Sequence, residues 1–291
     1  MADPLLLVHG GAGDIPEASR AAHAAGCQEA AEAGGAVLAE GGSSVAAVCA
    51  AVEVLETNPL YNAGTGCALT LAGRISLDAA IMEGHTRQAA GLAALDAFPH
   101  PIRLAERMLT EPEVLLVGQP ASQWAERMGF RRVPENELTT EAALKQWHRV
   151  VEEGASPNFA GGTVGAVARD AEGRLAAGTS TGGTMGKKPG RVGDSPIIGC
   201  GTYADNQCAV SATGEGEAFL RSVFGARVAD AVRYGEAPAD ALQRMLERVR
   251  DFFGGIGGAI LITPDSGPEA FWTTVGMSHG WWTPEGSGCA I

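Results

Sequence analysis

The sequence predicts an α+β fold in which helices pack in layers against antiparallel sheets. Short apolar segments typical of strands come in neighbouring pairs toward both ends of the chain, and segments with helical spacing lie between them. Strands that follow one another closely form antiparallel hairpins, whereas a doubly wound parallel sheet needs regular alternation of strands and helices. The 291 residues are enough for one large domain or two small ones.

The first part of the chain is predicted to hold one buried strand followed by helices. Leu5–Val8 is a continuous apolar run that stops at His9 and two glycines. The spacing of apolar residues then predicts helices over 17–40, from Ser43 or Ser44 to Leu55, over 101–110 and over 121–128. Short strands are expected at 68–71 and 75–77.

The second part is predicted to follow a linker. Residues 134–162 are typical of a helix followed by a mobile polar segment, and this is the clearest boundary in the sequence. Thr163–Ala168 and Leu175–Ser180 suit a hairpin that turns at 170–173. The remaining expected elements are a strand at 208–212, helices at 217–232 and 237–253, and strands at 259–263 and 270–274.

The composition is that of an acidic globular protein. The net charge is −13, from 21 basic and 34 acidic residues, so phosphate backbones are repelled and nucleic-acid binding is not expected. No stretch approaches the ~20 apolar residues of a membrane span, and the start lacks the basic segment of a signal peptide. The six cysteines form no CxxC pair and suit small buried residues in a reducing compartment. We therefore expect a cytoplasmic protein without membrane contact.

The sequence carries no convincing motif of the familiar hydrolases. The HExxH motif of zinc peptidases is absent, and the one GxSxG pattern, at 178–182, leads into a glycine-rich polar loop rather than into the helix that the serine-hydrolase elbow requires. None of the six histidines has a partner at ligand spacing, which argues against a zinc site. His9 stands out because it ends a predicted strand beside glycines. A structural hydrogen-bonding role is its favoured interpretation, and a functional role stays open.

Thr, Gly, Arg and Asp are concentrated between residues 162 and 216. A polar linker that leads into Gly162-Thr163 at the head of a strand is what self-cleavage requires. The glycine leaves its carbonyl open to attack by the Thr163 hydroxyl through an N→O acyl shift. Hydrolysis then frees an α-amine with a pKa of about 7.7–8, which can act as the base for its own hydroxyl. From these residues alone, a structural threonine at a strand start is the favoured alternative.

These segments resemble the plant-type asparaginase and isoaspartyl aminopeptidase family of N-terminal-nucleophile (Ntn) hydrolases. The heptapeptide Gly-Arg-Val-Gly-Asp-Ser-Pro at 190–196 is the most specific of them. The others are Gly161–Val167, Thr179–Gly183, Ser211–Glu217, Leu5–Gly13, Asn58–Gly66, Leu77–Gly84 and Gly254–Gly258. The resemblance therefore covers nearly the whole chain.

The resemblance implies a catalytic group at a new N-terminus. Cleavage between Gly162 and Thr163 would make Thr163 the nucleophile of the mature enzyme. Thr181 would hydrogen-bond the Thr163 hydroxyl and hold it, and Asn62 would position the surroundings of the nucleophile.

The resemblance also implies the groups that bind the substrate and its oxyanion. Arg191 would grip the α-carboxylate through its planar guanidinium fork, and Asp194 would receive the α-ammonium. Thr213 and the Gly214 amide would form the oxyanion hole, and Gly216 would contact the substrate through its backbone. Two alternatives stay open here: a mutual surface ion pair of Arg191 with Asp194, and a plain strand-to-helix turn at 213–216.

The family also carries a sodium ion bound by backbone carbonyl groups. Its counterpart here would be formed by Leu55, Glu56, Asn58, Tyr61, Ala63 and Thr65. A hard cation with oxygen ligands suits a turn rich in Gly, Asn and Pro. The ion would be structural, and the resemblance implies no cofactor for catalysis.

Three positions depart from the family's usual pattern. Glu83 stands where the family more often has Asp. Glu215 places a carboxylate between the two glycines of the substrate loop, where it would tune the preference for substrate side chains. Gly161 replaces a bulkier residue before the cleavage site, which would alter the rate of self-cleavage.

The resemblance thus implies a four-layer αββα sandwich of the Ntn type. One domain is expected, cut into an α chain of residues 1–162 and a β chain of residues 163–291, with two such pairs forming a dimer. The expected substrate is a small molecule, either L-asparagine or an isoaspartyl dipeptide. It would be hydrolysed through an acyl-enzyme to release L-aspartate.

Two other functions fit parts of the sequence. A glycosylasparaginase or a threonine endopeptidase would share the fold, but such relatives tend to have Asp before the catalytic Thr, where this chain has Gly162. A non-catalytic nucleotide-binding protein would explain the glycines at 10–13 after a strand. The Asp-Ile-Pro that follows breaks that fingerprint, and no Walker lysine is present.

Overall fold

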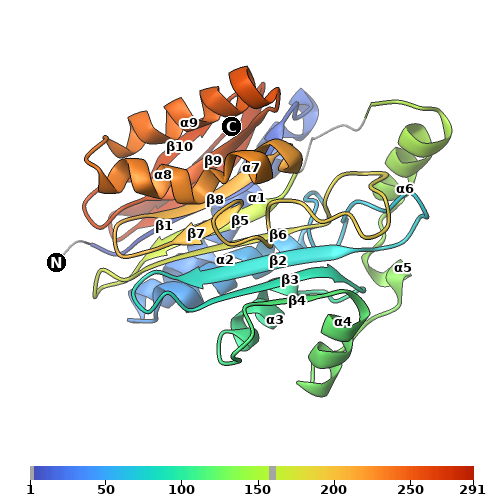
Figure 1. Cartoon of the computed structure of the whole chain (residues 1–291), viewed down its shortest axis with the longest axis horizontal. Helices are drawn as coiled ribbons and strands as arrows, with labels where there is room; N and C mark the ends of the chain where they lie inside the picture. Colours follow the sequence, from blue (N-terminus) through green and yellow to red (C-terminus); the bar gives the residue numbers. More distant parts are fainter. Residues whose placement is uncertain (1–2, 157–161) are drawn as a thin grey trace.

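Two β-sheets lie face to face at the centre of the molecule (Figure 1). In the computed structural model, which describes residues 3–156 and 162–291, the larger sheet has eight strands: β1 (Leu5–Gly13), β2 (Leu77–Glu83), β3 (Ala89–Leu95), β4 (Leu115–Val117), β5 (Val164–Arg169), β6 (Leu175–Thr181), β11 (Gly276–Thr283) and β12 (Gly286–Ala290). Their order across the sheet is β12-β11-β1-β5-β6-β2-β3-β4. The smaller sheet has the order β10-β9-β8-β7 and contains β7 (Thr202–Ala204), β8 (Ala209–Gly214), β9 (Gly257–Ile262) and β10 (Glu269–Trp272).

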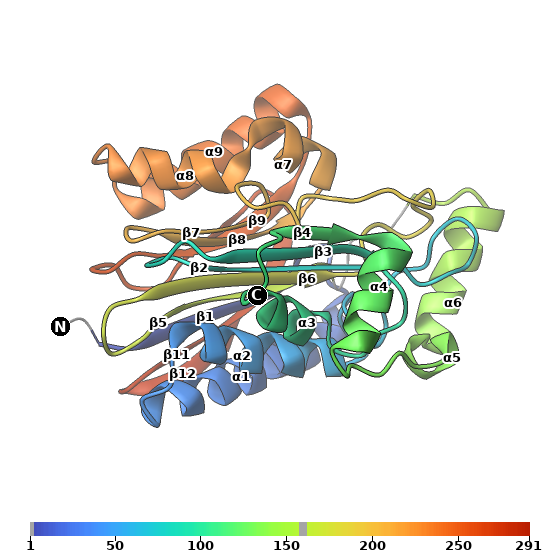
Figure 2. The same cartoon turned by 60° about the horizontal axis from the view of Figure 1, so that its bottom comes forward.

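Helices cover the outer face of each sheet (Figures 1 and 2). The larger sheet is covered by α1 (Glu17–Ala39), α2 (Ser44–Thr57), α3 (Pro101–Met108) and α4 (Gly118–Arg127). The smaller sheet is covered by α8 (Phe224–Arg233) and α9 (Pro238–Phe253), with α7 (Gly216–Ser222) packed against both helices. This arrangement of helices and sheets confirms the predicted α+β class.

Local interactions fix the start and the end of α2. The Ser43 side chain caps the helix by accepting a hydrogen bond from the Ala46 amide at 3.2 Å. The Asp170 carboxylate, from the turn between β5 and β6, accepts a second bond from the Ser44 amide at 3.1 Å. The helix ends before Asn58-Pro59, because a proline disfavours helical geometry in the residue before it. The hairpin that follows residue 163 is thereby tied to a helix of the first half of the chain.

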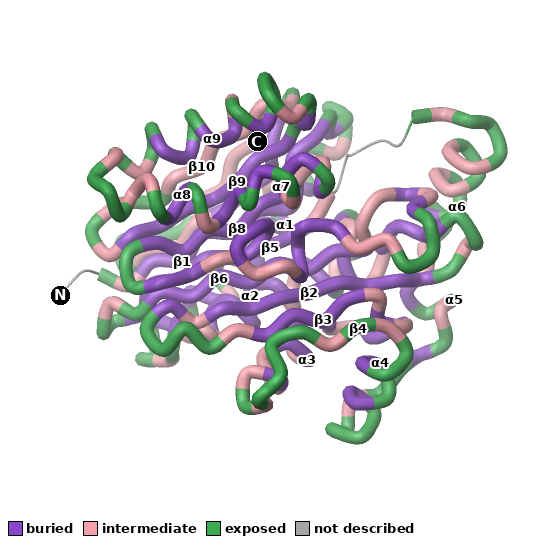
Figure 3. The backbone as a smooth tube through the Cα atoms, in the orientation of Figure 1, coloured by how far each residue is buried: buried purple, intermediate pink, exposed green. Residues whose placement is uncertain are grey.

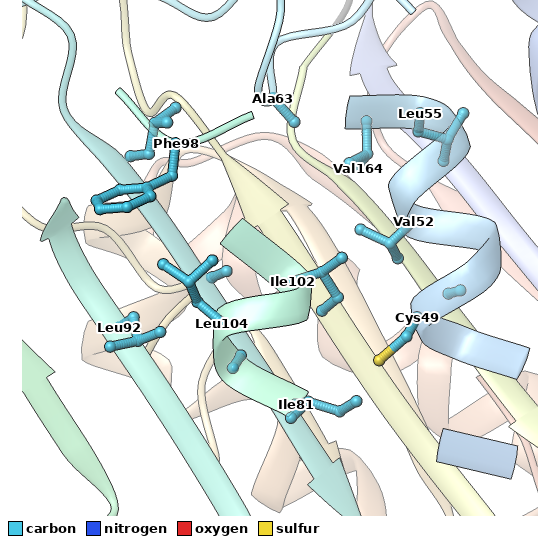
Figure 4. Packing of buried hydrophobic residues seen from close by; sticks show 14 of the residues in the cluster. Cys49, Val52, Leu55, Ala63, Ile81, Leu92, Phe98, Ile102, Leu104 and Val164 are labelled. Carbon is cyan, nitrogen blue, oxygen red and sulfur yellow. The ribbon is translucent and has the colours of Figure 1, made fainter. Parts of the chain in front are cut away.

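Apolar side chains fill the spaces between these elements, and most strand residues are buried (Figure 3). Over the larger sheet, Val52 of α2 and Ile102 of α3 pack with Ile81 of β2 (Figure 4). The facing sides of the two sheets are apolar at one end, where Val167 and Ile260 belong to one buried cluster. The other end of this interface is polar, and the candidate site lies there.

Several strands differ from the sequence-based expectations. The hairpin of β5 and β6 is confirmed, with its turn at the predicted place. The expected strands at 68–71 and 75–77 are wrong, since those residues form only isolated bridges, of Leu69 with Ile75 and of Thr70 with Lys187, and Leu77 is already the first residue of β2. The real strands β2 and β3 begin later and were not predicted, nor were β11 and β12. Alanine and glycine dominate β3 and β12, so tertiary burial rather than strand propensity decides their conformation.

The helix predicted over 217–232 is two helices. α7 ends at Ser222 and α8 begins at Phe224, because Val223 between them has a left-handed conformation with φ of +49°. The break allows the rings of Phe219 and Phe224 to meet edge to face, with centroids 4.9 Å apart, in the core of the smaller sheet. Tertiary packing of aromatic rings therefore overrides a continuous helical pattern.

The predicted linker contains more helix than expected in its described part. Residues 134–156 include α5 (Glu135–Leu138), α6 (Glu141–Trp147) and a π-helical turn at His148–Glu152. Residues 157–161, which include Gly161, lie outside the described part of the chain. The glycines at 10–13 belong to β1 rather than to a turn between a strand and a helix, so the nucleotide-binding interpretation is wrong.

All six cysteines are free thiols. Five of them are buried, as predicted, and Cys289 is half-buried. Within residues 3–156 and 162–291, no helix combines the length and the apolar character needed to cross a membrane.

Candidate active site

A pocket opens at the polar end of the interface between the sheets. It brings together all nine residues for which the sequence predicted a role in cleavage, catalysis or substrate binding. These are Asn62, Gly162, Thr163, Thr181, Arg191, Asp194, Thr213, Gly214 and Gly216. They come from the larger sheet, the smaller sheet and the loops between them, so the site forms only when the whole chain folds.

The hydroxyl of Thr163 is held at the head of β5. Its Oγ1 donates a hydrogen bond to Thr181 Oγ1 at 2.9 Å, and Thr181 is the last residue of the neighbouring strand β6. Thr181 Oγ1 also accepts a bond from the Gly183 amide at 2.9 Å. Thr181 is buried and Thr163 is half-buried, so the nucleophile candidate faces the pocket on an ordered support.

Asn62 holds the glycine turn that follows Thr181. Its Nδ2 donates to the Gly183 carbonyl at 2.6 Å, and its Oδ1 accepts from the Ala68 amide at 2.6 Å. Its backbone carbonyl accepts from the Gly182 amide at 2.9 Å. Asn62 therefore fixes the backbone next to Thr181 and makes no hydrogen bond with Thr163 itself.

The residues predicted to stabilise an oxyanion lie on the opposite sheet. Thr213 is buried near the end of β8, and its Oγ1 accepts a long bond of 3.4 Å from the Ala12 amide. Gly214 has φ of +147°, and a Cβ atom there would lie 2.4 Å from the Ile256 carbonyl oxygen. Only glycine fits this close approach. The turn into α7 is therefore real, and it also lines the pocket.

Arg191 presents one half-buried positive charge to the pocket. Its side chain is 17% exposed, and its Nε and one terminal nitrogen donate to the Glu217 carboxylate at 2.9 and 2.8 Å. Burial lowers the pKa of Arg191, but Glu217 outweighs that effect and the pKa lies above its ordinary value. The sequence left open an ion pair with Asp194. The structure pairs Arg191 with Glu217 instead, a partner that sequence reasoning missed because the two lie far apart in the chain.

Asp194 is a buried carboxyl group with unused hydrogen-bonding capacity. It is 4% exposed, and its Oδ2 has no hydrogen-bond partner among the described residues. Burial raises the pKa of Asp194 from 3.8 to about 7, against the opposing effects of its own backbone amide and of Arg191. Cβ atoms added to Gly201 or Gly216 would lie 2.7 and 2.9 Å from the carboxylate oxygens, so glycines make room for it.

A buried ion pair lies behind the pocket and was not predicted. Lys187 Nζ is 3.9 Å from Asp78 Oδ2 and donates to the Ser76 carbonyl at 2.8 Å. Burial lowers the pKa of Lys187 and raises that of Asp78. A Cβ atom on Gly183, which lines the pocket, would lie 2.7 Å from Lys187 Nζ. The sequence feature that could have indicated this ion pair is Asp78, a charged residue inside the apolar segment at 77–81.

Gly162 lies against the first strand. A Cβ atom added to Gly11, which has φ of +104°, would lie 2.3 Å from the backbone nitrogen of Gly162. This close approach of two backbones needs glycine at position 11. The bond proposed for cleavage is therefore confined beside β1 rather than free in solvent.

The six residues proposed to bind sodium form a closed turn after α2. The Thr65 amide donates to the Glu56 carbonyl at 2.8 Å, and the Tyr61 amide donates to the Asn58 carbonyl at 3.2 Å. A Cβ atom on Gly64 would lie 2.5 Å from the Glu56 carbonyl oxygen, which shows how tightly the turn closes. In the described chain, no cluster of three or more His, Cys, Asp or Glu side chains is arranged to hold a metal ion.

The arrangement suits one kind of chemistry. A half-buried guanidinium and a buried carboxyl group, both lining one pocket, match the carboxylate and ammonium of an amino acid. A hydroxyl held on one sheet faces a threonine and a backbone turn on the other, as acyl transfer requires.

Comparison with known proteins agrees with this geometry. A family model described as asparaginase matches residues 2–289. The chain is 38% identical over 281 residues to an isoaspartyl peptidase/L-asparaginase of Danio rerio, covering 94% of this chain and 91% of that protein. It is also 38% identical to an isoaspartyl peptidase of Salmonella typhimurium (95% and 94% covered) and to a plant-type L-asparaginase of Pyrococcus abyssi (91% and 92% covered). Because these matches span nearly the whole chain, the protein belongs to the asparaginase family.

Proposed function

We propose that this protein is a threonine amidohydrolase that releases L-aspartate from L-asparagine and from isoaspartyl dipeptides, with Thr163 as its nucleophile. The observation that carries the proposal is the hydrogen bond of 2.9 Å between Thr163 and Thr181 inside a pocket that also holds Arg191 and Asp194. The names and coverage of the relatives support the same reaction.

Maturation is an intramolecular acyl shift. Thr163 Oγ1 attacks the carbonyl carbon of Gly162, the bond from that carbon to the Thr163 nitrogen breaks, and an ester forms in its place. Water hydrolyses the ester, which gives a carboxylate on Gly162 and a free amine on Thr163. Confinement of Gly162 against Gly11 supports this step, because attack needs the reacting atoms held close together.

Turnover uses the freed amine as the base. The Thr163 hydroxyl loses its proton to that amine and attacks the side-chain carbonyl of the substrate, while Thr181 holds the hydroxyl. Thr213 and the Gly214 amide stabilise the oxyanion. Ammonia, or the amino acid of a dipeptide, takes a proton and leaves. Water then hydrolyses the ester and L-aspartate is released.

Substrate binding relies on two opposite charges at fixed positions. Arg191 binds the α-carboxylate, Asp194 binds the α-ammonium, and Gly216 contacts the substrate through its backbone. L-asparagine and an isoaspartyl dipeptide share these two groups and differ only in what leaves. One pocket therefore serves both substrates.

The proposal includes the architecture and assembly implied by the family. The fold is a four-layer αββα sandwich of the Ntn type, supported by the helices on the outer face of each sheet. The single domain is cut into chains of residues 1–162 and 163–291, and two such pairs form a dimer. A cytoplasmic location is supported by the six free thiols, which suit a reducing compartment.

A structural sodium ion would be held by the carbonyl groups of the turn after α2. The turn fits a hard cation, because Gly64 and Gly66 lie close against the carbonyl oxygens of Glu56, Pro59 and Tyr61. The full ligand set is Leu55, Glu56, Asn58, Tyr61, Ala63 and Thr65. The ion takes no part in the chemical steps.

The experiment that tests the function compares the wild-type chain with Thr163→Ala. Intact mass should show two fragments from wild type, breaking between residues 162 and 163, and one uncut chain from the variant. Release of aspartate from L-asparagine and from isoaspartyl-leucine should depend on cleavage. Full activity in Thr163→Ala would contradict the proposal, and activity confined to glycoasparagine would favour a glycosylasparaginase instead.

A further inference from the structure

A row of buried polar side chains lies between the two sheets, next to the residues that line the pocket. His9 of β1 and Thr179 of β6 come from the larger sheet, and Ser211 of β8 and Thr202 of β7 come from the smaller sheet. All four are 0% exposed. We call them the buried polar row.

The row is continuous across the interface. His9 Nε2 is hydrogen-bonded to Ser211 Oγ at 2.9 Å, and Ser211 Oγ to Thr179 Oγ1 at 2.8 Å. Thr202 Oγ1 lies 2.7 Å from Thr179 Oγ1 and 2.9 Å from the Ser195 carbonyl oxygen, in the loop that carries Asp194. Burial lowers the pKa of His9 to about 3, so its ring is neutral at ordinary pH and adds no charge to the row.

Strand register relates this row to the active site. His9 pairs with Gly165, and Gly165 pairs with Thr179, so one row crosses β1, β5 and β6. Thr163 stands two residues before Gly165, at the head of β5, whereas Thr181 and Thr213 stand two residues after Thr179 and Ser211. Side chains two residues apart on a strand share a face. The polar row is therefore the layer directly beneath the nucleophile and the oxyanion residues.

Gly165 makes room for the row. A Cβ atom at this position would lie 2.0 Å from Ser211 Oγ and 2.6 Å from His9 Nε2. Any side chain on β5 here would separate His9 from Ser211 and force the sheets apart. The absence of a side chain two residues after Thr163 thus allows direct hydrogen bonds between the sheets.

We infer that the buried polar row sets the spacing between the two sheets at the active site, and that its members are positioning residues for Thr163 and its oxyanion donors. The inference rests on the proposed function. The nucleophile lies on one sheet and Thr213 on the other, and catalysis needs such groups held within about 0.5 Å of their productive geometry. Apolar contacts at the other end of the interface are not directional, whereas hydrogen bonds fix distance and angle.

The test removes single hydroxyls while keeping side-chain shape. Ser211→Ala removes the member that joins His9 to Thr179, and Thr179→Val replaces a hydroxyl by a methyl group of similar size. Thr179→Ser keeps the hydroxyl and should restore most of the activity that Thr179→Val loses. Ser122→Ala is the matched control, because Ser122 is equally buried and its Oγ accepts one bond from the Asp96 amide in the region of α4.

The measurements are thermal unfolding, the rate of cleavage at 162–163, and kcat and KM for L-asparagine per cleaved molecule. We expect Ser211→Ala and Thr179→Val to slow cleavage and to lower kcat at least tenfold, with KM within about threefold of wild type. Ser122→Ala should lower the melting temperature and leave kcat unchanged. If Ser211→Ala does not fold, the comparison of Thr179→Val with Thr179→Ser tests the inference on its own.

The outcomes separate this inference from the proposed function. A wild-type chain that is neither cut nor active overturns the proposed function. A wild type that is cut and active, with Ser211→Ala and Thr179→Val only less stable and equally active, overturns the inference alone.

Discussion

Thr163 and Thr181 stand at the head of one strand and the end of the next, with their hydroxyl oxygens 2.9 Å apart. Thr181 Oγ1 accepts from Thr163 and from the Gly183 amide, so both of its lone pairs are used. The direction of the Thr163 hydroxyl is therefore set by a partner that cannot rotate freely.

Replacing Thr181 by valine should damage catalysis more than folding. We expect kcat per cleaved molecule to fall about 100-fold, or roughly 2.7 kcal/mol, since the nucleophile loses its support. Thr181→Ser should retain more activity because it keeps the hydroxyl. Steady-state kinetics on purified, cut protein measures the effect. Thr57→Val, on the exposed end of α2, is the control, and an equal loss of activity there would contradict the expectation.

Glu217 should act on substrate affinity through Arg191. It occupies Nε and one terminal nitrogen of the guanidinium, which leaves other N–H groups of the fork free for a substrate carboxylate. Without this anchor the fork loses its fixed direction, so Glu217→Ala should raise KM about tenfold, or roughly 1.4 kcal/mol, with a smaller change in kcat. Glu236→Ala, which breaks a similar but exposed pair with Arg244, should change neither. An unchanged KM in Glu217→Ala would rule out the anchoring role.

Substrate binding should weaken in acid because of Asp194. Burial raises its pKa to about 7 in the free protein, and only the ionised carboxylate attracts an ammonium group. As pH falls below about 7 the carboxyl becomes protonated, so KM should rise by up to about tenfold per pH unit. Asp194→Asn should have a high KM that no longer varies with pH in this range. Initial rates between pH 5 and 8 provide the check, and a flat KM for wild type would refute it.

Glu56 should make the protein less stable as pH rises. Burial raises the pKa of this fully buried carboxyl from 4.5 to about 8, and its Oε2 has no hydrogen-bond partner in the described chain. Because the folded state holds the proton more tightly than the unfolded state, the free energy of unfolding falls between about pH 4.5 and 8 and then levels off. Glutamine does not titrate, so the melting temperature of Glu56→Gln, relative to that of wild type, should rise as pH increases across this range. A constant difference at pH 5, 7 and 9 would show that Glu56 does not titrate as expected.

The left-handed Val223 should be a site of stabilisation. A β-branched residue with φ of +49° carries a steric cost of about 1–2 kcal/mol, which asparagine largely avoids. Val223→Asn should therefore raise the melting temperature by about 2–4 °C. Val275→Asn is a control at an exposed position without positive φ, and thermal unfolding should show no gain there. A lower melting temperature for Val223→Asn would mean that side-chain packing outweighs the strain.

The site was more predictable from the sequence than the strands around it. The resemblance of several short motifs to one family allowed Arg191, Asp194 and Thr163 to be named before their positions were known, although the residues alone favoured a structural threonine. The alanine-rich strand β3 carries no such signal, because burial within the complete sheet decides its conformation.

Hydrogen-bond and ion-pair partners that lie far apart in the chain could not be predicted either. Nothing near Arg191 in the sequence indicates Glu217, and nothing near His9 indicates Ser211, which lies 202 positions away. Such pairs depend on register between strands and on the packing of two sheets, which a single sequence does not specify.

For a chain cut at the proposed bond between residues 162 and 163, the order of strands in the larger sheet has a further consequence. Reading across the sheet, β12 and β11 come from after residue 163, β1 from before it, β5 and β6 from after it, and β2, β3 and β4 from before it. Each half is threaded between strands of the other. Separation would break three strand boundaries at once, and neither half alone holds the whole larger sheet. If the chain is cut at the proposed bond, fragments made separately should therefore not combine into enzyme, and a cut molecule that is pulled apart should not re-form.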